Sequence, residues 1–129
     1  MHATGSFDIT LTPQTAAPAI ADAKLGRMTI EKQFHGDLEA ASLGEMLSVR
    51  TEVQGSAGYV ALERVTGTLH GRKGSFVLQH SGTMSRGAAS LVLSVVPDSG
   101  SEELIGLSGA MSIQIDQGKH SYTMDYLLP

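Results

Sequence analysis

The 129-residue chain contains no cysteine and no asparagine. It can therefore form no disulfide bond, no cysteine-based zinc site and no thiol nucleophile, and it offers no acceptor for N-linked glycosylation. Positive charge is also scarce, since nine Lys and Arg stand against 13 Asp and Glu and leave a net charge of −4. No basic run exceeds the pair Arg72 and Lys73. Because proteins that bind a phosphate backbone carry a basic patch, we expect no nucleic-acid partner.

Long apolar runs are missing as well. Residues 1–11 lack the basic start and the apolar stretch of ~7 to 15 residues that a secretory leader needs. Apolar runs such as 91–93 and 95–97 are far shorter than the ~18 to 20 residues that cross a bilayer. We therefore expect no membrane association and a cytoplasmic location.

The chain nevertheless has enough apolar material for one core. Leu, Ile, Val and Phe make up about a quarter of it, above the roughly 20% below which chains stay disordered. Its length also falls in the range of ~100 to 200 residues that is usual for one domain. We predict a single globular domain over residues 1–129.

Apolar residues recur at every second position along most of the sequence, for example over 7–11, 28–34, 91–95, 111–115 and 122–128. A period of two is typical of half-buried strands, and sustained helical spacing is almost absent. The exception is the Ala-rich stretch 15–24, which Pro13 and Pro18 limit to a loop or one or two helical turns. The sequence therefore predicts an all-β protein.

Glycines mark the joints between the alternating runs, as at 54–55, 70–71 and 117–118. Joints this short favour antiparallel hairpins, because parallel strands need crossovers of about a dozen residues or more. We expect eight to ten strands and favour a closed antiparallel meander barrel of about eight, since closure removes exposed sheet edges. A sandwich is the alternative. Four further glycines are interpreted as bends in strongly coiled strands, namely Gly36, Gly67, Gly82 and Gly106.

The candidate site lies in segments 59–69 and 73–82. Alternation places His80 on the face of Phe76 and Leu78, and it places Glu63 on the face of Tyr59. In a barrel Glu63 and His80 would then lie on neighbouring strands in a shared apolar interior. Burial disfavours a charged carboxylate and a nearby imidazole favours it, which gives a pair that can move protons near neutral pH. We therefore predict Glu63 and His80 as the catalytic residues.

The expected ligand contacts are one apolar side chain and three hydroxyl donors, namely Phe76, Tyr59, Tyr122 and Tyr126. A purely structural role is the alternative, since two adjacent buried titratable groups can simply satisfy each other. The sequence holds no nucleophile elbow, phosphate loop, calcium loop or zinc-protease motif. We predict no cofactor and no metal site.

Several segments resemble a bacterial family of domains of unknown function, namely 34–42, 44–47, 55–64, 74–82, 99–104 and 120–126. The resemblance is most specific over 59–82, which includes Gly-Ser-Phe-Val-Leu-Gln-His-Ser-Gly at 74–82. Structural relatives of that family resemble plant allene oxide cyclase. The resemblance implies a closed eight-stranded meander barrel with a central cavity that self-associates into a homo-oligomer. The plant cyclase acts on an unstable fatty-acid epoxide, but no motif here carries its catalytic residues over.

Two functions are consistent with these features. In the first, the barrel binds or isomerises a small apolar molecule, with a carbonyl or epoxide held by Glu63 and His80, and any enzymatic activity would be that of an isomerase, cyclase or lyase. In the second, the barrel is a non-catalytic structural or interaction module with a packed interior, and Val60 and Leu62 form a subunit interface. An enclosed interior pocket of roughly 300 Å³ or more beside Glu63 or His80 would favour the first function.

Overall fold

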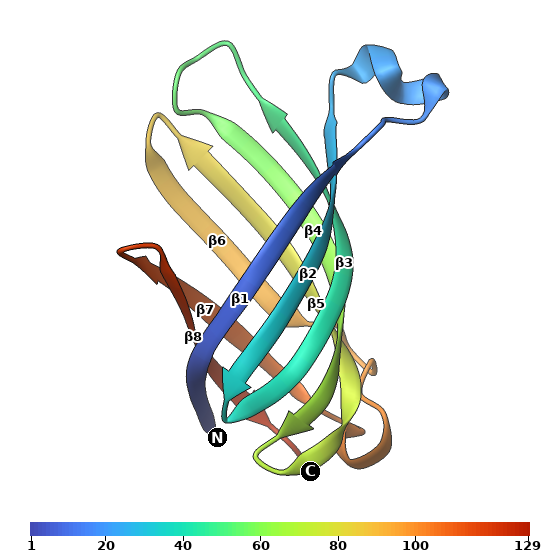
Figure 1. Cartoon of the computed structure of the whole chain (residues 1–129), viewed down its shortest axis with the longest axis vertical. Helices are drawn as coiled ribbons and strands as arrows, with labels where there is room; N and C mark the ends of the chain where they lie inside the picture. The colour runs from blue at the N-terminus through green and yellow to red at the C-terminus, as the bar shows by residue number, and fades with distance from the viewer.

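The computed structural model describes all 129 residues and shows a closed antiparallel barrel in which eight strands follow one another in chain order (Figure 1). The last strand pairs with the first, so the predicted meander barrel is confirmed and the sandwich is excluded. The strands are β1 (His2–Gln14), β2 (Gly26–Gly36), β3 (Leu38–Arg50), β4 (Ala57–Leu69), β5 (Arg72–Ser85), β6 (Ala88–Val95), β7 (Ser108–Asp116) and β8 (Lys119–Leu127).

Two short 3-10 helices interrupt the meander. The first, η1 (Pro18–Ala23), falls in the stretch where the sequence predicts a loop or one or two turns. The second, η2 (Glu102–Leu104), lies between β6 and β7. No helix in the structure has the length and apolar character needed to span a membrane.

The core occupies one end of the barrel, which we call the closed end. Both chain termini and the turn between β4 and β5 lie there (Figure 1). Inward-facing side chains at this end are excluded from solvent, as the 0% exposure of Phe34 and Met124 and the 1% exposure of Leu38 and Leu69 show. Burial of such apolar groups is the main favourable term in folding.

The opposite end, which carries η1 and the β5–β6 turn, is the open end (Figure 1). Here alternation still points apolar side chains toward the barrel axis, but solvent reaches them. Leu11 is 44% exposed, Met84 40% and Leu91 41%. The interior is therefore packed at one end and accessible at the other.

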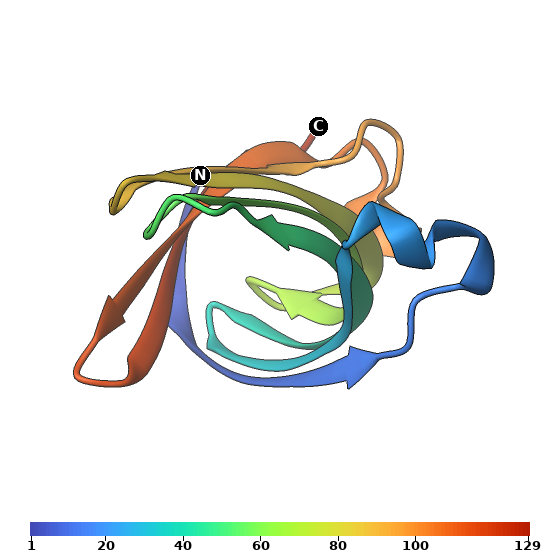
Figure 2. The ribbon, with the colours of Figure 1, turned by 90° about the horizontal axis from the view of Figure 1, so that it is seen from above.

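The barrel wall is incomplete between β6 and β7. β4 and β5 pair along their whole length, from Ala57 opposite Met84 to Leu69 opposite Arg72. In contrast, β6 and β7 pair only at Ser94 and Ala110. The β7–β8 hairpin leans away from β6 beyond that point, as Figure 2 shows in the view from above. We call this gap the seam.

All three tyrosines of the chain lie directly opposite a glycine on a neighbouring strand: Tyr59 faces Gly82, Tyr122 faces Gly5 and Tyr126 faces Gly109. A Cβ atom added at Gly82 would lie 2.4 Å from a ring carbon of Tyr59. These glycines therefore leave room for the rings to lie against the inner wall, as in aromatic rescue of strand glycines.

The four glycines predicted as bends lie in different parts of the chain. Gly67 and Gly82 lie inside strands, and Gly36 ends β2 with a φ of 107°. The expectation for Gly106 is wrong, because it lies in the loop between η2 and β7 and serves a turn with a φ of 85°.

Candidate functional site

Glu63 and His80 lie side by side inside the barrel, on neighbouring strands as the sequence predicts. His80 Nε2 is 2.7 Å from Glu63 Oε1, and the two residues are 4% and 1% exposed. Gly44 faces Glu63 across the β3–β4 pair, and a Cβ atom there would lie 2.7 Å from the Cα of Glu63. The missing side chain at this position makes room for the buried carboxylate.

Two further partners of Glu63 are residues that the sequence reasoning missed. The Lys32 ammonium lies 2.9 Å from Oε1, and the Ser42 hydroxyl donates to Oε2 over 2.6 Å. Lys32 Nζ also lies 5.0 Å from the ring centre of Phe7 and 5.7 Å from that of Phe34, within the range of cation–π attraction. The site is therefore a four-residue cluster drawn from β2, β3, β4 and β5.

A signal for these two residues is present in the sequence. Lys32 falls on the inward phase between Ile30 and Phe34, and Ser42 continues the phase of Leu38 and Ala40. A polar residue in an otherwise apolar face is unfavourable unless it is paired, so such a residue indicates a buried partner. The same argument led to His80, and it applies equally to Lys32.

The cluster holds Glu63 in its charged form. Burial alone would raise the pKa of the carboxyl, but the His80 hydrogen bond, the Lys32 charge and the Ser42 hydroxyl outweigh it and lower the pKa to about 2. Glu63 and Lys32 thus form a buried ion pair with no net charge. Their side chains are 0% and 2% exposed.

Tyr59 extends the cluster toward the open end. Its hydroxyl lies 3.4 Å from His80 Nδ1. Burial and the negative charge of Glu63 raise the pKa of Tyr59, so its phenol keeps its proton. An ionised carboxylate can only accept a hydrogen bond, so His80 Nε2 donates to Glu63. The other nitrogen of a neutral imidazole, Nδ1, then accepts from the Tyr59 hydroxyl. The result is a carboxylate–imidazole–hydroxyl chain, an arrangement that in other proteins moves protons.

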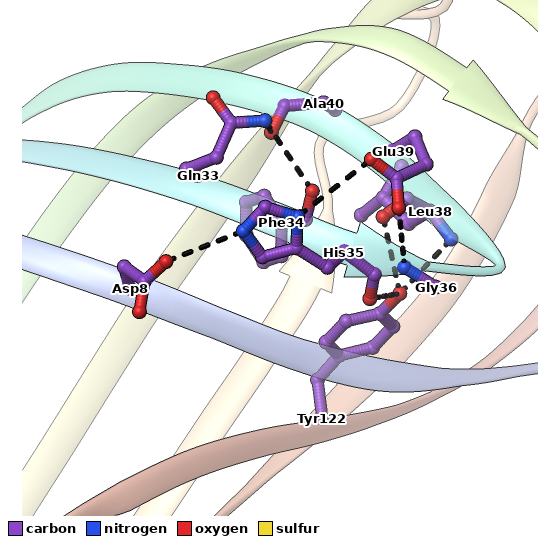
Figure 3. A network of polar contacts seen from close by, with 9 residues as sticks. All are labelled: Asp8, Gln33, Phe34, His35, Gly36, Leu38, Glu39, Ala40 and Tyr122. Atoms are coloured by element: carbon purple, nitrogen blue, oxygen red, sulfur yellow. Dashed lines mark hydrogen bonds and ion pairs between the residues drawn. The ribbon is translucent and has the colours of Figure 1, made fainter.

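The other predicted ligand contacts lie apart from this cluster, in the core or at the closed end. The Tyr122 hydroxyl accepts from the Leu38 amide at 2.9 Å and donates to the His35 carbonyl at 3.0 Å, where β2 turns into β3 (Figure 3). The Tyr126 hydroxyl instead contacts a side chain, Nδ1 of His70, at the β4–β5 turn. Phe76 is 1% exposed and faces Val65 within the core.

A hollow of about 840 Å³ lies on the outside of the barrel, between η1 and the outer wall. Its lining includes Ile20 of η1 and the outward-facing Leu47, Val60 and Leu62. His80 is also among the lining residues, although its side chain points to the inside of the wall, where it contacts Glu63. This hollow is therefore not the enclosed interior pocket that would favour a ligand-binding barrel.

Val60 and Leu62 point outward, as expected, and are 53% and 54% exposed. Their role in a subunit interface stays a prediction, as does the cytoplasmic location. The structure brings no three His, Asp or Glu side chains together in a group that could hold a metal ion.

Comparisons with known proteins place this architecture among relatives. A family model described as "Protein of unknown function (DUF3224)" matches residues 3–126. A crystal structure of a protein of unknown function from the DUF3224 family of Shewanella oneidensis MR-1 is similar to the chain, with 52% sequence identity and a TM-score of 0.93. The alignment covers 100% of this chain and 97% of that one. A search of curated proteins gives no match.

Proposed function

The chain belongs to the DUF3224 family, and we propose that its barrel binds a small, largely apolar molecule at the open end, with one neutral oxygen of that molecule accepting a hydrogen bond from Tyr59, beside His80. The observation that carries the proposal is the position of the cluster. The buried cluster, whose polar atoms are all hydrogen-bonded, ends at the half-buried Tyr59 hydroxyl. This hydroxyl faces the open end, where solvent reaches the inward-facing apolar side chains.

The exposed inward-facing side chains support a ligand site. Apolar residues scattered singly over a surface are ordinary, but exposed apolar side chains that face the inside of one barrel are typical of binding sites. Leu11, Met84 and Leu91 come from three different strands and share this side. A ligand that covers them gains the free energy of apolar burial, about 25 cal/mol per Å².

The polar end of the ligand follows from the charge balance of the cluster. Lys32 and Glu63 neutralise each other and every buried polar side-chain atom has a hydrogen-bond partner. A ligand carboxylate would therefore find no free cation there. A carbonyl or epoxide oxygen can instead accept from the Tyr59 hydroxyl, whose contact with His80 is long at 3.4 Å.

Proton transfer at this site would use the same atoms. His80 Nδ1 would take a proton from the carbon next to a ligand carbonyl, Tyr59 would donate to the enolate oxygen, and Glu63 would stabilise the imidazolium. In a β,γ-unsaturated carbonyl compound the enolate is conjugated with the double bond, and return of the proton to the γ carbon is an isomerisation. Incubation of 2-decanone with the protein in D₂O would reveal the first proton transfer as deuterium uptake beside the carbonyl, and we expect His80→Gln to abolish it.

Binding itself is tested with 2-decanone by isothermal titration calorimetry. We expect Tyr59→Phe to weaken binding about tenfold, as the loss of one hydrogen bond of roughly 1.4 kcal/mol predicts. Tyr122→Phe is the matched control, because it removes the same hydroxyl from the closed end. Native mass spectrometry of freshly purified protein would identify any retained metabolite directly.

The competing function is a structural module, which the complete pairing of the cluster favours. Absence of binding by the wild type, together with a native mass equal to that of the bare chain, would establish this alternative. Equal affinities of the wild type and Tyr59→Phe would show that the polar end has been placed wrongly.

A further inference from the structure

The geometry points to the seam between β6 and β7 as the passage that holds an alkyl chain of the ligand, which makes the ligand class an elongated aliphatic carbonyl or epoxide compound. This inference rests on the proposed function. It adds the direction in which the ligand lies and the length of chain that the protein recognises.

The first support is the missing backbone pairing. Beyond Ser94 and Ala110, toward the open end, the facing edges of β6 and β7 have no partner in the barrel. Closure of a barrel normally removes such edges, because unpaired strand edges invite association with other chains. On this side of the barrel the wall is therefore not held together by backbone hydrogen bonds toward the open end.

The second support is the character and exposure of the side chains that flank the gap. Leu93 and Met111 lie beside the last paired position and are 2% and 5% exposed. One step further toward the open end Leu91 is 41% exposed, and Ile115 beyond it is 68% exposed. All the inward-facing residues at the gap are aliphatic or thioether side chains. An alkyl chain suits this lining, and a charged chain does not.

The third support is continuity with the polar cluster. Tyr59, Gly82 and Leu91 form one cross-strand row on the inner wall, since each pairs with the next across β4, β5 and β6. Only the glycine separates the tyrosine ring from the leucine at the seam. Two strand spacings span about 10 Å. With C–C bonds of ~1.5 Å, an extended alkyl chain of about eight carbons covers that distance.

The experiment compares 2-decanone, whose longer arm has about eight carbons, with 2-hexanone, whose arm is about half as long. We expect the wild type to bind 2-decanone at least tenfold more tightly. Leu91→Asp should remove that advantage, because it places a charge in the path of the chain. The matched control is Val92→Asp. Val92 is the next residue on β6, lies on the outer face and is 62% exposed, so this variant should still bind 2-decanone more tightly than 2-hexanone.

Leu91→Gln serves as a second variant if the charge prevents folding, and circular dichroism checks the fold of each. If Tyr59→Phe weakens 2-decanone binding but both Leu91 variants bind it normally, the seam is wrong and the proposed function stands. If Tyr59→Phe is also without effect, the proposed function fails. Loss of binding in Leu62→Asp, on the outer wall, would instead place the ligand in the external hollow and overturn both.

Discussion

Tyr122 at the closed end and Tyr59 toward the open end are built alike but connected differently. Each ring lies over a glycine of the neighbouring strand. The Tyr122 hydroxyl is held by three backbone groups of the β2–β3 turn, namely the Leu38 amide and the carbonyls of His35 and Leu38. The Tyr59 hydroxyl has one partner, His80, at 3.4 Å. A hydroxyl with short bonds to backbone stabilises the fold, whereas a hydroxyl with one long bond near solvent is free to bind a ligand.

The buried cluster of Lys32, Ser42, Glu63 and His80 lies between these two regions. Its ion pair is not in itself a source of stability, since taking two charges out of water costs about as much as their attraction returns. Its value to the protein is to keep Glu63 charged and His80 oriented below Tyr59. The predictions below separate this role from that of the closed end.

The largest effect is expected from breaking the ion pair. Glu63→Gln leaves the buried Lys32 charge without an opposite charge, and Lys32→Met removes the cation that faces Glu63. Each variant should lower the free energy of unfolding by about 3 to 5 kcal/mol. The double variant should regain most of that loss. Urea denaturation gives the free energy of unfolding of the wild type, both single variants and the double variant. If the loss in the double variant equals the sum of the two single losses, the direct pairing is disproved.

Acid should weaken the cluster next. The folded pKa of Glu63 is about 2, below its ordinary value of 4.5. The resulting stabilisation, of the order of 3 kcal/mol, is present above pH 4.5 and is lost as the pH falls toward 2. The stability difference between the wild type and Glu63→Gln should therefore shrink over this range. A difference that stays constant from pH 5 to pH 2 would contradict the lowered pKa.

The glycines beneath the two tyrosines should respond differently to a methyl group. At Gly5 a Cβ atom would lie 1.9 Å from the His35 carbonyl oxygen, so Gly5→Ala must separate two strands and should cost about 1 to 3 kcal/mol. At Gly82 the close contacts are ring atoms of Tyr59, which can turn aside. Gly82→Ala should therefore cost under about 1 kcal/mol while weakening 2-decanone binding. A larger loss of stability in Gly82→Ala than in Gly5→Ala would show that Tyr59 is held more rigidly than Tyr122.

The smallest expected difference is between the hydroxyls themselves. Tyr122→Phe leaves the buried Leu38 amide without its acceptor and should cost about 1 to 3 kcal/mol. Tyr59→Phe should cost less than about 1 kcal/mol, because its only bond is long. Thermal melting of both variants measures this, and similar melting points would erase the distinction between the two ends.

The fold and half of the cluster were predictable from the sequence because both depend on local pattern. Alternation gives the face of each strand, and the short turn at His70 and Gly71 aligns β4 with β5, so Glu63 and His80 had to be neighbours. Alternation does not give the height of a residue along the barrel axis. For that reason Tyr122 and Tyr126 were expected near Glu63 although they lie at the closed end.

Lys32 and Ser42 face each other across the one-residue turn between β2 and β3, but their contact with Glu63 depends on the register of β3 against β4, which residues 51–56 connect. The seam was equally hidden, because it results from the path of the long connection between β6 and β7. Pairing of strands that are joined by longer connections is set by three-dimensional packing. Local pattern carries little information about it.

The methyl NMR signals of the methionines test the difference between the two ends most directly. Met28, Met46 and Met84 are partly accessible at the open end, whereas Met111 and Met124 are 5% and 0% exposed in the core. On addition of 2-decanone we predict shifts of the first three signals and none of the last two. Shifts confined to the core methionines, or no shift at all at saturating ligand, would contradict a binding site at the open end.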